Sequence, residues 1–351
     1  MRSRSPRRAD RSEGGDSGAR PRYSVVLPVH DEEESLPELA RRLKAVLDRL
    51  DGPSEVIMVD DGSADGSLEA MRELVQRDPR FKAVELSRNF GHQVAITAGI
   101  DLAQGEAVVV MDSDLQHPPE TIEELAALWL EGYDVVYAVR ADRAGEPWLK
   151  RITAKIFYRI LGRLVDIDVP AHAGDFRLVD RRALEAFRQL RETNRYVRGM
   201  FSWIGFHQVG VEYAYEDRLG GHSKYTLKRM SQLAGNALTS FSSAPLRVAL
   251  HVGFAVSTLS FIAGIAAVVA KIADAFTVPG WASLIFVTSF LGGVQLFVLG
   301  VVGVYLSRVY EEVKARPLYI VRDWHGFEER PENIGPSFGA AREARRPADG
   351  S

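Results

Sequence analysis

Residues 108–120 read VVVMDSDLQHPPE and join an apolar run to two closely spaced carboxylates. The β-branched run predicts a buried strand that leads into Asp112 and Asp114. Side chains two residues apart lie on one side of an extended chain, so both carboxylates are expected to face the same site. Hard oxygen ligands suit Mg²⁺ or Mn²⁺, and such an ion would neutralise a diphosphate. The alternative is a strand-end turn in which the two aspartates cap backbone N–H groups.

The segments around this motif alternate between short apolar runs and amphipathic stretches. The pattern predicts strands over 23–29, 55–59, 83–86, 107–111 and 134–139, with helices over 33–50, 67–76, 94–103 and 120–131. Apolar strands separated by helices indicate an α/β domain whose parallel sheet is covered on both faces. Further along the chain we expect a loop over 171–182 and a helix over 183–190.

A second acidic motif, DDGSADGS, follows the predicted strand 55–59. In α/β sheets ligands bind at the carboxyl ends of the strands, where Asp60 and Asp61 could accept hydrogen bonds from a ribose or a base. Gly62 would let the backbone turn sharply, although Asp-Gly-Ser is also common in loops without a ligand. The first strand is followed by PVHDEEES rather than G-x-G-x-x-G, which argues against a dinucleotide cofactor.

Two long apolar stretches, 248–272 and 281–306, dominate the last third of the chain. Each is long enough to cross about 30 Å of hydrocarbon, which takes about 20 residues, and the alternative is a pair of buried helices in a soluble domain. The short linker predicts a hairpin, and the flanking basic residues are Arg247, Arg308, Lys314 and Arg316. The positive-inside rule then predicts a multi-pass protein of the inner or plasma membrane, with both termini and the α/β domain in the cytoplasm. Residues 225–247 have the spacing of an amphipathic helix, either interfacial or on an ordinary protein surface.

Composition narrows the remaining classes. The net charge of −3 argues against a nucleic-acid partner. The chain has no cysteine, which excludes disulfides, a thiolate zinc site and a cysteine nucleophile. Residues 1–22 lack the apolar core of a secretory signal and are expected to form a disordered basic tail, and 307–351 a juxtamembrane segment with a disordered tail.

Seven motifs occur in a fixed order ahead of the hairpin. They are LPVHDEEESL, DDGSADGS, RNFGHQVAITAGID, MDSDLQHPPE, GDFRLVDR, RYVRGMFSWIGF and RLGGHSKY. This set resembles the family-2 glycosyltransferases and, among them, the bacterial polyprenyl-phosphate glycosyltransferases related to dolichyl-phosphate mannose synthase. The resemblance covers residues 23–313 and implies a GT-A-type catalytic domain over 23–224.

The resemblance also implies roles for individual residues. A nucleoside pocket would be lined by Pro28, His30, Glu32, Asp60 and Asp61. The metal and diphosphate site would be formed by Asp112, Ser113, Asp114 and Gln116, of which all but Ser113 would be metal ligands. Groups around the phosphates would be Arg198, Arg218, Ser223 and Lys224. The catalytic residues would be Asp114, Arg218 and Asp175, which would lie nearest the acceptor. A lone histidine is usually a surface or packing residue, which is the expectation for His92.

The reaction implied is an inverting, Mg²⁺- or Mn²⁺-dependent hexosyl transfer from a nucleotide-sugar, with UDP-glucose as first choice, to polyprenyl (undecaprenyl or decaprenyl) phosphate in the bilayer. A phosphate has a second pKa of about 6 and is largely ionised at neutral pH, so Asp175 is expected to orient a substrate more than to remove a proton. We also expect a homo-oligomer, for example a tetramer. The alternatives are a processive polysaccharide synthase, which would normally need more membrane helices, and a non-catalytic membrane scaffold.

Overall fold

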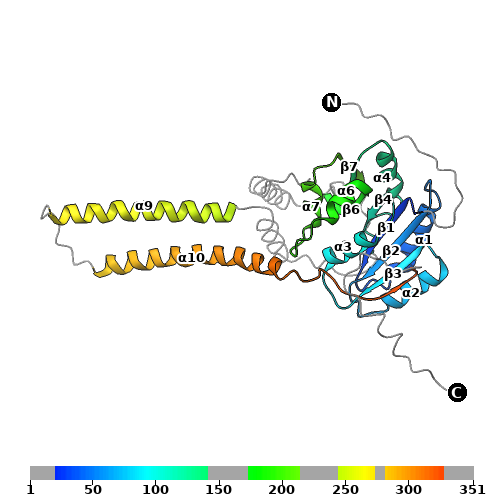
Figure 1. Cartoon of the computed structure of the whole chain (residues 1–351), viewed down its shortest axis with the longest axis horizontal. Helices are drawn as coiled ribbons and strands as arrows, with labels where there is room; N and C mark the ends of the chain where they lie inside the picture. Colours follow the sequence, from blue (N-terminus) through cyan, green and yellow to red (C-terminus); the bar gives the residue numbers. More distant parts are fainter. Residues whose placement is uncertain (1–19, 141–172, 214–243, 273–280, 328–351) are drawn as a thin grey trace, which may run out of the picture. The chain divides into compact units, whose positions relative to one another are not determined.

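The computed structural model describes residues 20–140, 173–213, 244–272 and 281–327. Two compact units make up this part of the chain: an α/β unit that also includes residues 317–327, and a unit of two long helices (Figure 1).

Eight strands of the described residues form one sheet in the order β7-β5-β6-β4-β1-β2-β3-β8. They are β1 (Tyr23–Val29), β2 (Ser54–Asp60), β3 (Phe81–Leu86), β4 (Ala107–Val110), β5 (Val135–Arg140), β6 (Ala173–Asp180), β7 (Gln208–Tyr213) and β8 (Val321–His325). The pairs among β1 to β4 are parallel, as the sequence predicts. The sheet as a whole is mixed rather than parallel, because β6 and β8 run antiparallel to their neighbours.

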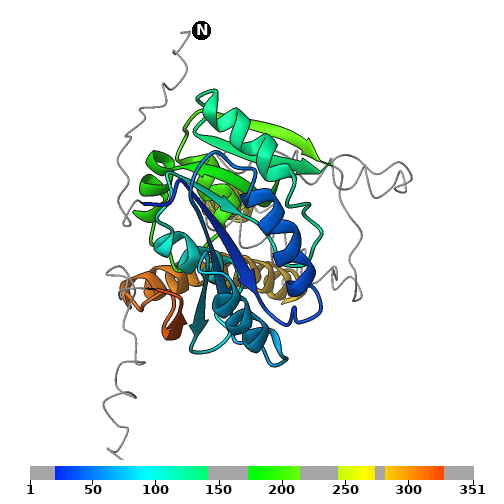
Figure 2. The same ribbon diagram turned by 90° about the vertical axis from the view of Figure 1, so that its right-hand side faces the viewer.

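Helices cover both faces of this sheet (Figure 2). They are α1 (Leu36–Leu47), α2 (Ser67–Arg77), α3 (His92–Leu102), α4 (Thr121–Leu130), α6 (Arg181–Arg188) and α7 (Val197–Trp203). Alternate residues of β1 serve the two faces: Val25 and Leu27 join Leu39 of α1 in the main core, while Val26 meets α3. The contact with α3 depends on Gly99, since a Cβ at that position would overlap the Val26 side chain.

Strand β6 shows that the expected loop over 171–182 is wrong. It pairs with both β4 and β5 and lies inside the sheet. Phe176 and Leu178 are buried in the core, but the alternate residues Asp175 and Arg177 are buried as well. Charged residues at interior positions hide the apolar alternation that identifies a strand, and here they are kept because they serve the site described below.

Strand β8 shows that the chain does not become a disordered tail directly after Arg322. It adds an antiparallel edge to β3, and residues 328–351 lie outside the described part. Just before it, the buried Tyr319 hydroxyl donates a 2.9 Å hydrogen bond to Asp101 Oδ2 on α3. Arg322 donates to Glu85 Oε1 of β3 at 2.7 Å. The segment that follows the apolar helices is therefore part of the α/β unit.

The second unit consists of α9 (Ala244–Ile272) and α10 (Trp281–Val313), which lie side by side and antiparallel (Figure 1). By length and composition, Leu246–Ala266 and Phe290–Val313 are candidate membrane spans. Large apolar side chains on both helices are exposed, such as Phe254 at 74 % and Leu296 at 71 %. Core helices of a soluble domain would bury at least one face, so this exposure favours the membrane interpretation. The amphipathic stretch predicted over 225–247 lies outside the described residues up to 243.

Tyr319→Phe is expected to destabilise the α/β unit, because it removes a hydrogen bond to a buried carboxylate. The loss is about 1–2 kcal/mol, which lowers Tm by about 2–8 °C for a domain of this size. Thermal unfolding of the full chain in detergent measures it, with Tyr310→Phe at an exposed position of α10 as the matched control. Equal Tm values for Tyr319→Phe and the wild type would contradict the structural role of this segment.

Candidate active site

Hydrogen bonds from backbone N–H groups to side-chain oxygens connect the loop that follows β1 to the loop that follows β2 and to the start of α2. The N–H of Asp31 donates to Ser63 Oγ at 3.1 Å, and Asp31 Oδ1 accepts from the N–H of Ala64 at 2.8 Å. The N–H of Glu32 donates to Ser67 Oγ at 2.8 Å. Asp31 is held in the left-handed region with φ 56°, which its short polar side chain tolerates. The predicted nucleoside residues therefore lie on this connected pair of loops (His30, Glu32 and Asp61) or at the ends of the strands that lead into them (Pro28 and Asp60).

Asp61 fastens a third loop, the one between β3 and α3. Its two carboxylate oxygens accept the N–H groups of Phe90, at 2.7 Å, and Gly91, at 2.9 Å. Burial raises the pKa of Asp61, and the two N–H groups act in the opposite direction. This buried carboxylate thus supports the chain that leads into His92, whichever substrate binds nearby.

The same loop packs tightly against the turn after β2. Gly62 has φ 70°, and a Cβ there would lie only 2.7 Å from the backbone nitrogen of Asn89. The side chain of Asn89 lies 3.1 Å from His30 Nε2 in the loop after β1. Glycine is required at position 62 for both its conformation and this close approach.

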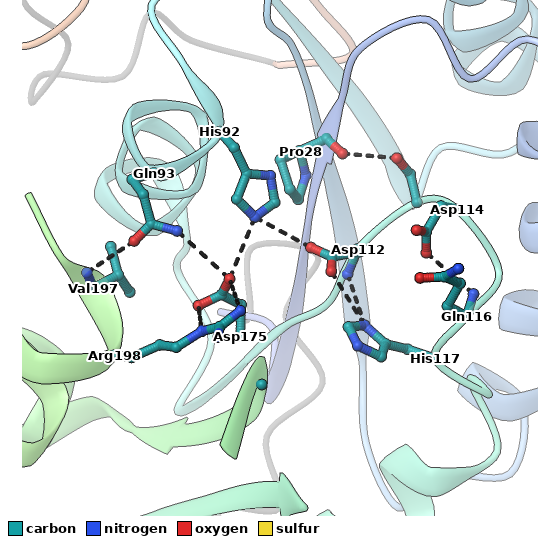
Figure 3. Close-up of polar contacts among 12 residues, drawn as sticks. Pro28, His92, Gln93, Asp112, Asp114, Gln116, His117, Asp175, Val197 and Arg198 are labelled. Carbon is teal, nitrogen blue, oxygen red and sulfur yellow. Dashed lines mark hydrogen bonds and ion pairs between the residues drawn. The ribbon is translucent and has the colours of Figure 1, made fainter. Parts of the chain in front are cut away.

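Asp112, in the loop after β4, and Asp175, in β6, lie close to each other. The pairing of the two strands ends at Val110, which lies opposite Arg177, and Asp112 follows two residues later. His92 bridges the two: its Nε2 lies 3.3 Å from Asp112 Oδ1 and 3.5 Å from Asp175 Oδ2 (Figure 3). His92 is exposed, as predicted for a surface residue, and it also contacts two predicted site carboxylates.

Arg198 of α7 forms a two-pronged ion pair with Asp175. Its Nε and Nη2 donate to the two carboxylate oxygens at 2.9 Å each, and the Asp175 side chain is only 4 % exposed. Burial alone would raise the pKa of Asp175, but the charge of Arg198 and the bonds from Arg198 and His92 hold it well below its usual range. Gln93 secures this arrangement, since its Oε1 accepts the N–H of Val197 at the start of α7 at 2.8 Å.

The charge of His92 follows from the same surroundings. Burial alone would lower the pKa of His92, but the hydrogen bond to Asp175 and the charges of Asp112 and Asp175 raise it to about 9. Its side chain is nevertheless 45 % exposed, so an incoming ligand can reach it.

A further cation, Arg177, lies behind the ion pair. Its Nη2 donates to the carbonyl of Gly174 at 2.7 Å, and its guanidinium carbon lies 4.8 Å from the ring centre of Phe201. Burial lowers the pKa of Arg177 to about 10, which leaves it positively charged at neutral pH. Being buried, it contributes positive potential to Asp175 rather than a contact to a substrate.

The predicted metal loop turns directly after β4, which ends at Val110, so the carboxylates do not continue the alternation of the strand. Asp112 points toward His92, whereas Asp114 points toward Gln116, whose N–H donates to Asp114 Oδ1 at 3.1 Å (Figure 3). Leu115, between Asp114 and Gln116, has φ 60°. This conformation is uncommon for a bulky residue and strains the turn. Ser113 Oγ ties the loop to β1 by donating to the carbonyl of Pro28 at 2.8 Å.

One oxygen of this loop fits a metal ligand. Asp112 Oδ1 is buried and accepts no hydrogen bond within the described part of the chain, which is rare for a carboxylate. The described residues contain no group of three or more His, Asp or Glu side chains that could hold an ion by themselves. Mg²⁺ typically takes one or two carboxylates and completes its shell with water and substrate phosphates, so the donor set fits an ion that binds together with a diphosphate.

His117 supports the metal loop from beneath. Its Nδ1 accepts the N–H of Asp112 at 3.3 Å, and its ring stacks on Phe176 with 5.1 Å between centres. Because the backbone nitrogen is the donor, Nδ1 is not available to bind an ion.

Comparison with known proteins agrees with this architecture. Residues 24–188 match the family described as "Glycosyl transferase family 2". A Bacillus subtilis (strain 168) protein described as an uncharacterized glycosyltransferase, YkcC, is 47 % identical over 308 residues, which are 88 % of this chain and 95 % of the relative. The chain belongs to glycosyl transferase family 2.

Other members of the family have more specific names. The SfII prophage-derived bactoprenol glucosyl transferase of Shigella flexneri is 37 % identical over 304 residues, covering 87 % of this chain and 98 % of the relative. A solved glucosyl-3-phosphoglycerate synthase from Mycobacterium tuberculosis, in complex with Mn²⁺, uridine-diphosphate-glucose and phosphoglyceric acid, is 17 % identical. The superposition covers 62 % of this chain and 78 % of that chain, with a TM-score of 0.43.

The glycosyltransferase thus brings together three of its predicted site residues, Asp112, Asp175 and Arg198, in one cluster (Figure 3). Three others lie outside the described residues: Arg218, Ser223 and Lys224. The roles predicted for individual residues stay predictions. Sequence reasoning missed His92, Gln93 and Arg177, although all of them lie inside the motifs RNFGHQVAITAGID and GDFRLVDR that identify the family.

Asp61→Asn should lower the Tm of the glycosyltransferase even without nucleotide, because an amide has one acceptor oxygen for two buried N–H groups. An unsatisfied buried donor costs about 1–3 kcal/mol. Thermal unfolding of the full chain in detergent tests this, with the exposed Asp48→Asn as control. A variant with wild-type Tm and only a higher KM for the donor would assign Asp61 to nucleoside binding instead.

Proposed function

We propose that this family-2 glycosyltransferase moves a hexose from a UDP-sugar, with UDP-glucose as the first choice, to polyprenyl phosphate at the cytoplasmic membrane face. The observation that carries the proposal is the similarity to bactoprenol glucosyl transferases along nearly their whole length. The two candidate membrane spans support it, since the acceptor is a membrane lipid.

Asp112, Asp114 and Gln116 would hold Mg²⁺ or Mn²⁺, with Asp112 Oδ1, which lies 3.3 Å from His92 Nε2 but accepts no hydrogen bond from the described residues, as the first ligand. When bound, the ion would neutralise the charge that develops on the departing nucleoside diphosphate. The nucleoside would lie against the connected loops, near Pro28, His30, Glu32, Asp60 and Asp61. The diphosphate would also be contacted by Ser113, Arg198, Arg218, Ser223 and Lys224, of which Arg218 is expected to be catalytic.

Asp175 would orient the acceptor rather than deprotonate it. A carboxylate whose pKa is held low by Arg198 and His92 is a weak base. A lipid phosphate with a second pKa of about 6 needs no strong base before it attacks the anomeric carbon in line. The protein would then balance the charge of the lipid phosphate and align its attacking oxygen with the anomeric carbon. Both effects raise the rate without a proton transfer.

The connection between α10 and β8 supports the orientation in the membrane. Only residues 314–320 lie between the end of α10 and the start of β8, too few to cross a bilayer in any conformation. We therefore expect the sheet on the same side of the membrane as the end of α10, where Arg308, Lys314 and Arg316 favour the cytoplasm. The homo-oligomer expected from the resemblance stays a prediction.

Wild-type protein in detergent with Mn²⁺, UDP-[¹⁴C]glucose and undecaprenyl phosphate is expected to form a radiolabelled lipid. Asp112→Asn should reduce the rate about 100-fold or more, because it removes the charge of the first metal ligand. Glu73→Gln, at an exposed position of α2, is the matched control. Transfer of another sugar would correct only the donor, whereas full activity of Asp112→Asn or activity without any divalent ion would contradict the metal site.

The absence of native cysteine allows a direct test of membrane orientation. We expect Asp274→Cys, between the two apolar stretches, to react with a membrane-impermeant maleimide in intact spheroplasts. Glu38→Cys on α1 should react only after the membrane is opened. The reverse labelling pattern would place the α/β unit on the outer side and overturn the cytoplasmic assignment.

A further inference from the structure

We propose that His92 binds the phosphate of the acceptor lipid, an inference that rests on the proposed transfer to polyprenyl phosphate. His92 lies in the first turn of α3 and contacts both Asp112 and Asp175.

The charges around Asp175 are nearly balanced before a substrate binds. An anionic phosphate that approaches Asp112 and Asp175 meets two carboxylates and needs positive partners nearby. Arg198 already donates to both oxygens of Asp175 and neutralises that residue one for one. Arg177 is buried and donates to backbone carbonyls. Of the two basic side chains that contact the Asp175 carboxylate, His92 is therefore the one that can turn a donor to a phosphate, and it is also the more exposed, at 45 % against 32 % for Arg198.

The geometry of His92 suits a phosphate ligand. Its Nε2 points at carboxylate oxygens 3.3 and 3.5 Å away, distances that are long for charge-assisted hydrogen bonds. A phosphate oxygen that enters beside Asp175 can take over this donor and form a shorter bond. The Nε2–H donor is present in the neutral Nε2–H tautomer as well as in the charged ring, so the contact does not depend on titration.

His92 is also held in place before a ligand arrives. The two backbone N–H groups just before it are bound by Asp61, and Asn89 contacts His30. Gln93, the next residue, anchors the start of α7, which carries Arg198. Such a donor loses little conformational freedom on binding, and its position is tied to that of Arg198.

The competing role for His92 is to position Asp112 for the metal and the donor diphosphate. The two roles differ in which substrate loses affinity. Binding of farnesyl phosphate and, separately, of UDP with Mn²⁺ is therefore measured on the full chain in detergent, together with KM values for undecaprenyl phosphate and UDP-glucose.

In His92→Ala, the Kd for farnesyl phosphate and the KM for undecaprenyl phosphate should rise about tenfold or more, as expected for a lost hydrogen bond to a charged group. The Kd for UDP with Mn²⁺ should change little. His92→Gln, whose amide N–H can reach the same position, should recover part of the acceptor affinity. His207→Ala is the matched control, because His207 is exposed and stacks on Tyr133 with 4.6 Å between ring centres.

Unchanged affinity for farnesyl phosphate in His92→Ala, or an equal loss for UDP with Mn²⁺, would overturn the assignment while leaving the glycosyl transfer intact. If the wild type binds farnesyl phosphate through His92 but transfers nothing from UDP-glucose, the donor is wrong and the role of His92 stands. If the wild type neither binds farnesyl phosphate nor glycosylates undecaprenyl phosphate, the acceptor is wrong and both proposals fall.

Discussion

Two carboxylates, Asp112 in the loop after β4 and Asp175 in β6, contact the same histidine nitrogen, and the surrounding residues compensate for their repulsion. Like charges this close disfavour the ionised forms, so Asp112 and Asp175 would tend to separate or take up a proton. Arg198 binds Asp175 at both oxygens, and His92 lies between the pair. Asp61 holds the loop that leads into His92, and Gln93 holds the start of the helix that carries Arg198. Both residues are therefore part of the site, although neither balances its charge.

This constraint explains which parts of the fold are visible in the sequence. Strands β1 to β4 and helices α1 to α4 follow from apolar periodicity, because their burial needs nothing beyond a hydrophobic face. Strand β6 departs from the pattern, since Asp175 and Arg177 occupy interior positions that only the finished site can stabilise. Strand β8 carries Arg322 and Asp323, charges typical of an edge strand, and it exists only because β3 offers an open edge.

In the candidate site, the motifs predict where the carboxylates lie but not which groups they contact. The motifs locate Asp61 and Asp112 correctly just after strands β2 and β4, because loops at that edge of an α/β sheet are where ligands bind. Such a carboxylate can accept backbone N–H groups or bind a ligand. Which of the two it does depends on residues that are far apart in the chain. Asp61 is occupied by the loop before α3, whereas Asp112 keeps one oxygen without a hydrogen bond. His92 gives no signal in the sequence, since its meaning comes from elements that only folding brings together.

An acceptor that is already anionic changes what the active site must provide. A sugar hydroxyl has to lose a proton as it attacks, so an enzyme that uses one needs a carboxylate with an accessible lone pair and a suitable pKa. Here Arg198 donates to both oxygens of Asp175, and the pKa of Asp175 is held low. Both features make Asp175 a weak general base. The same arrangement is suitable for a phosphate, which needs its charge balanced and its attacking oxygen aligned. The buried ion pair therefore favours a phosphate acceptor on physical grounds, separately from the names of the relatives.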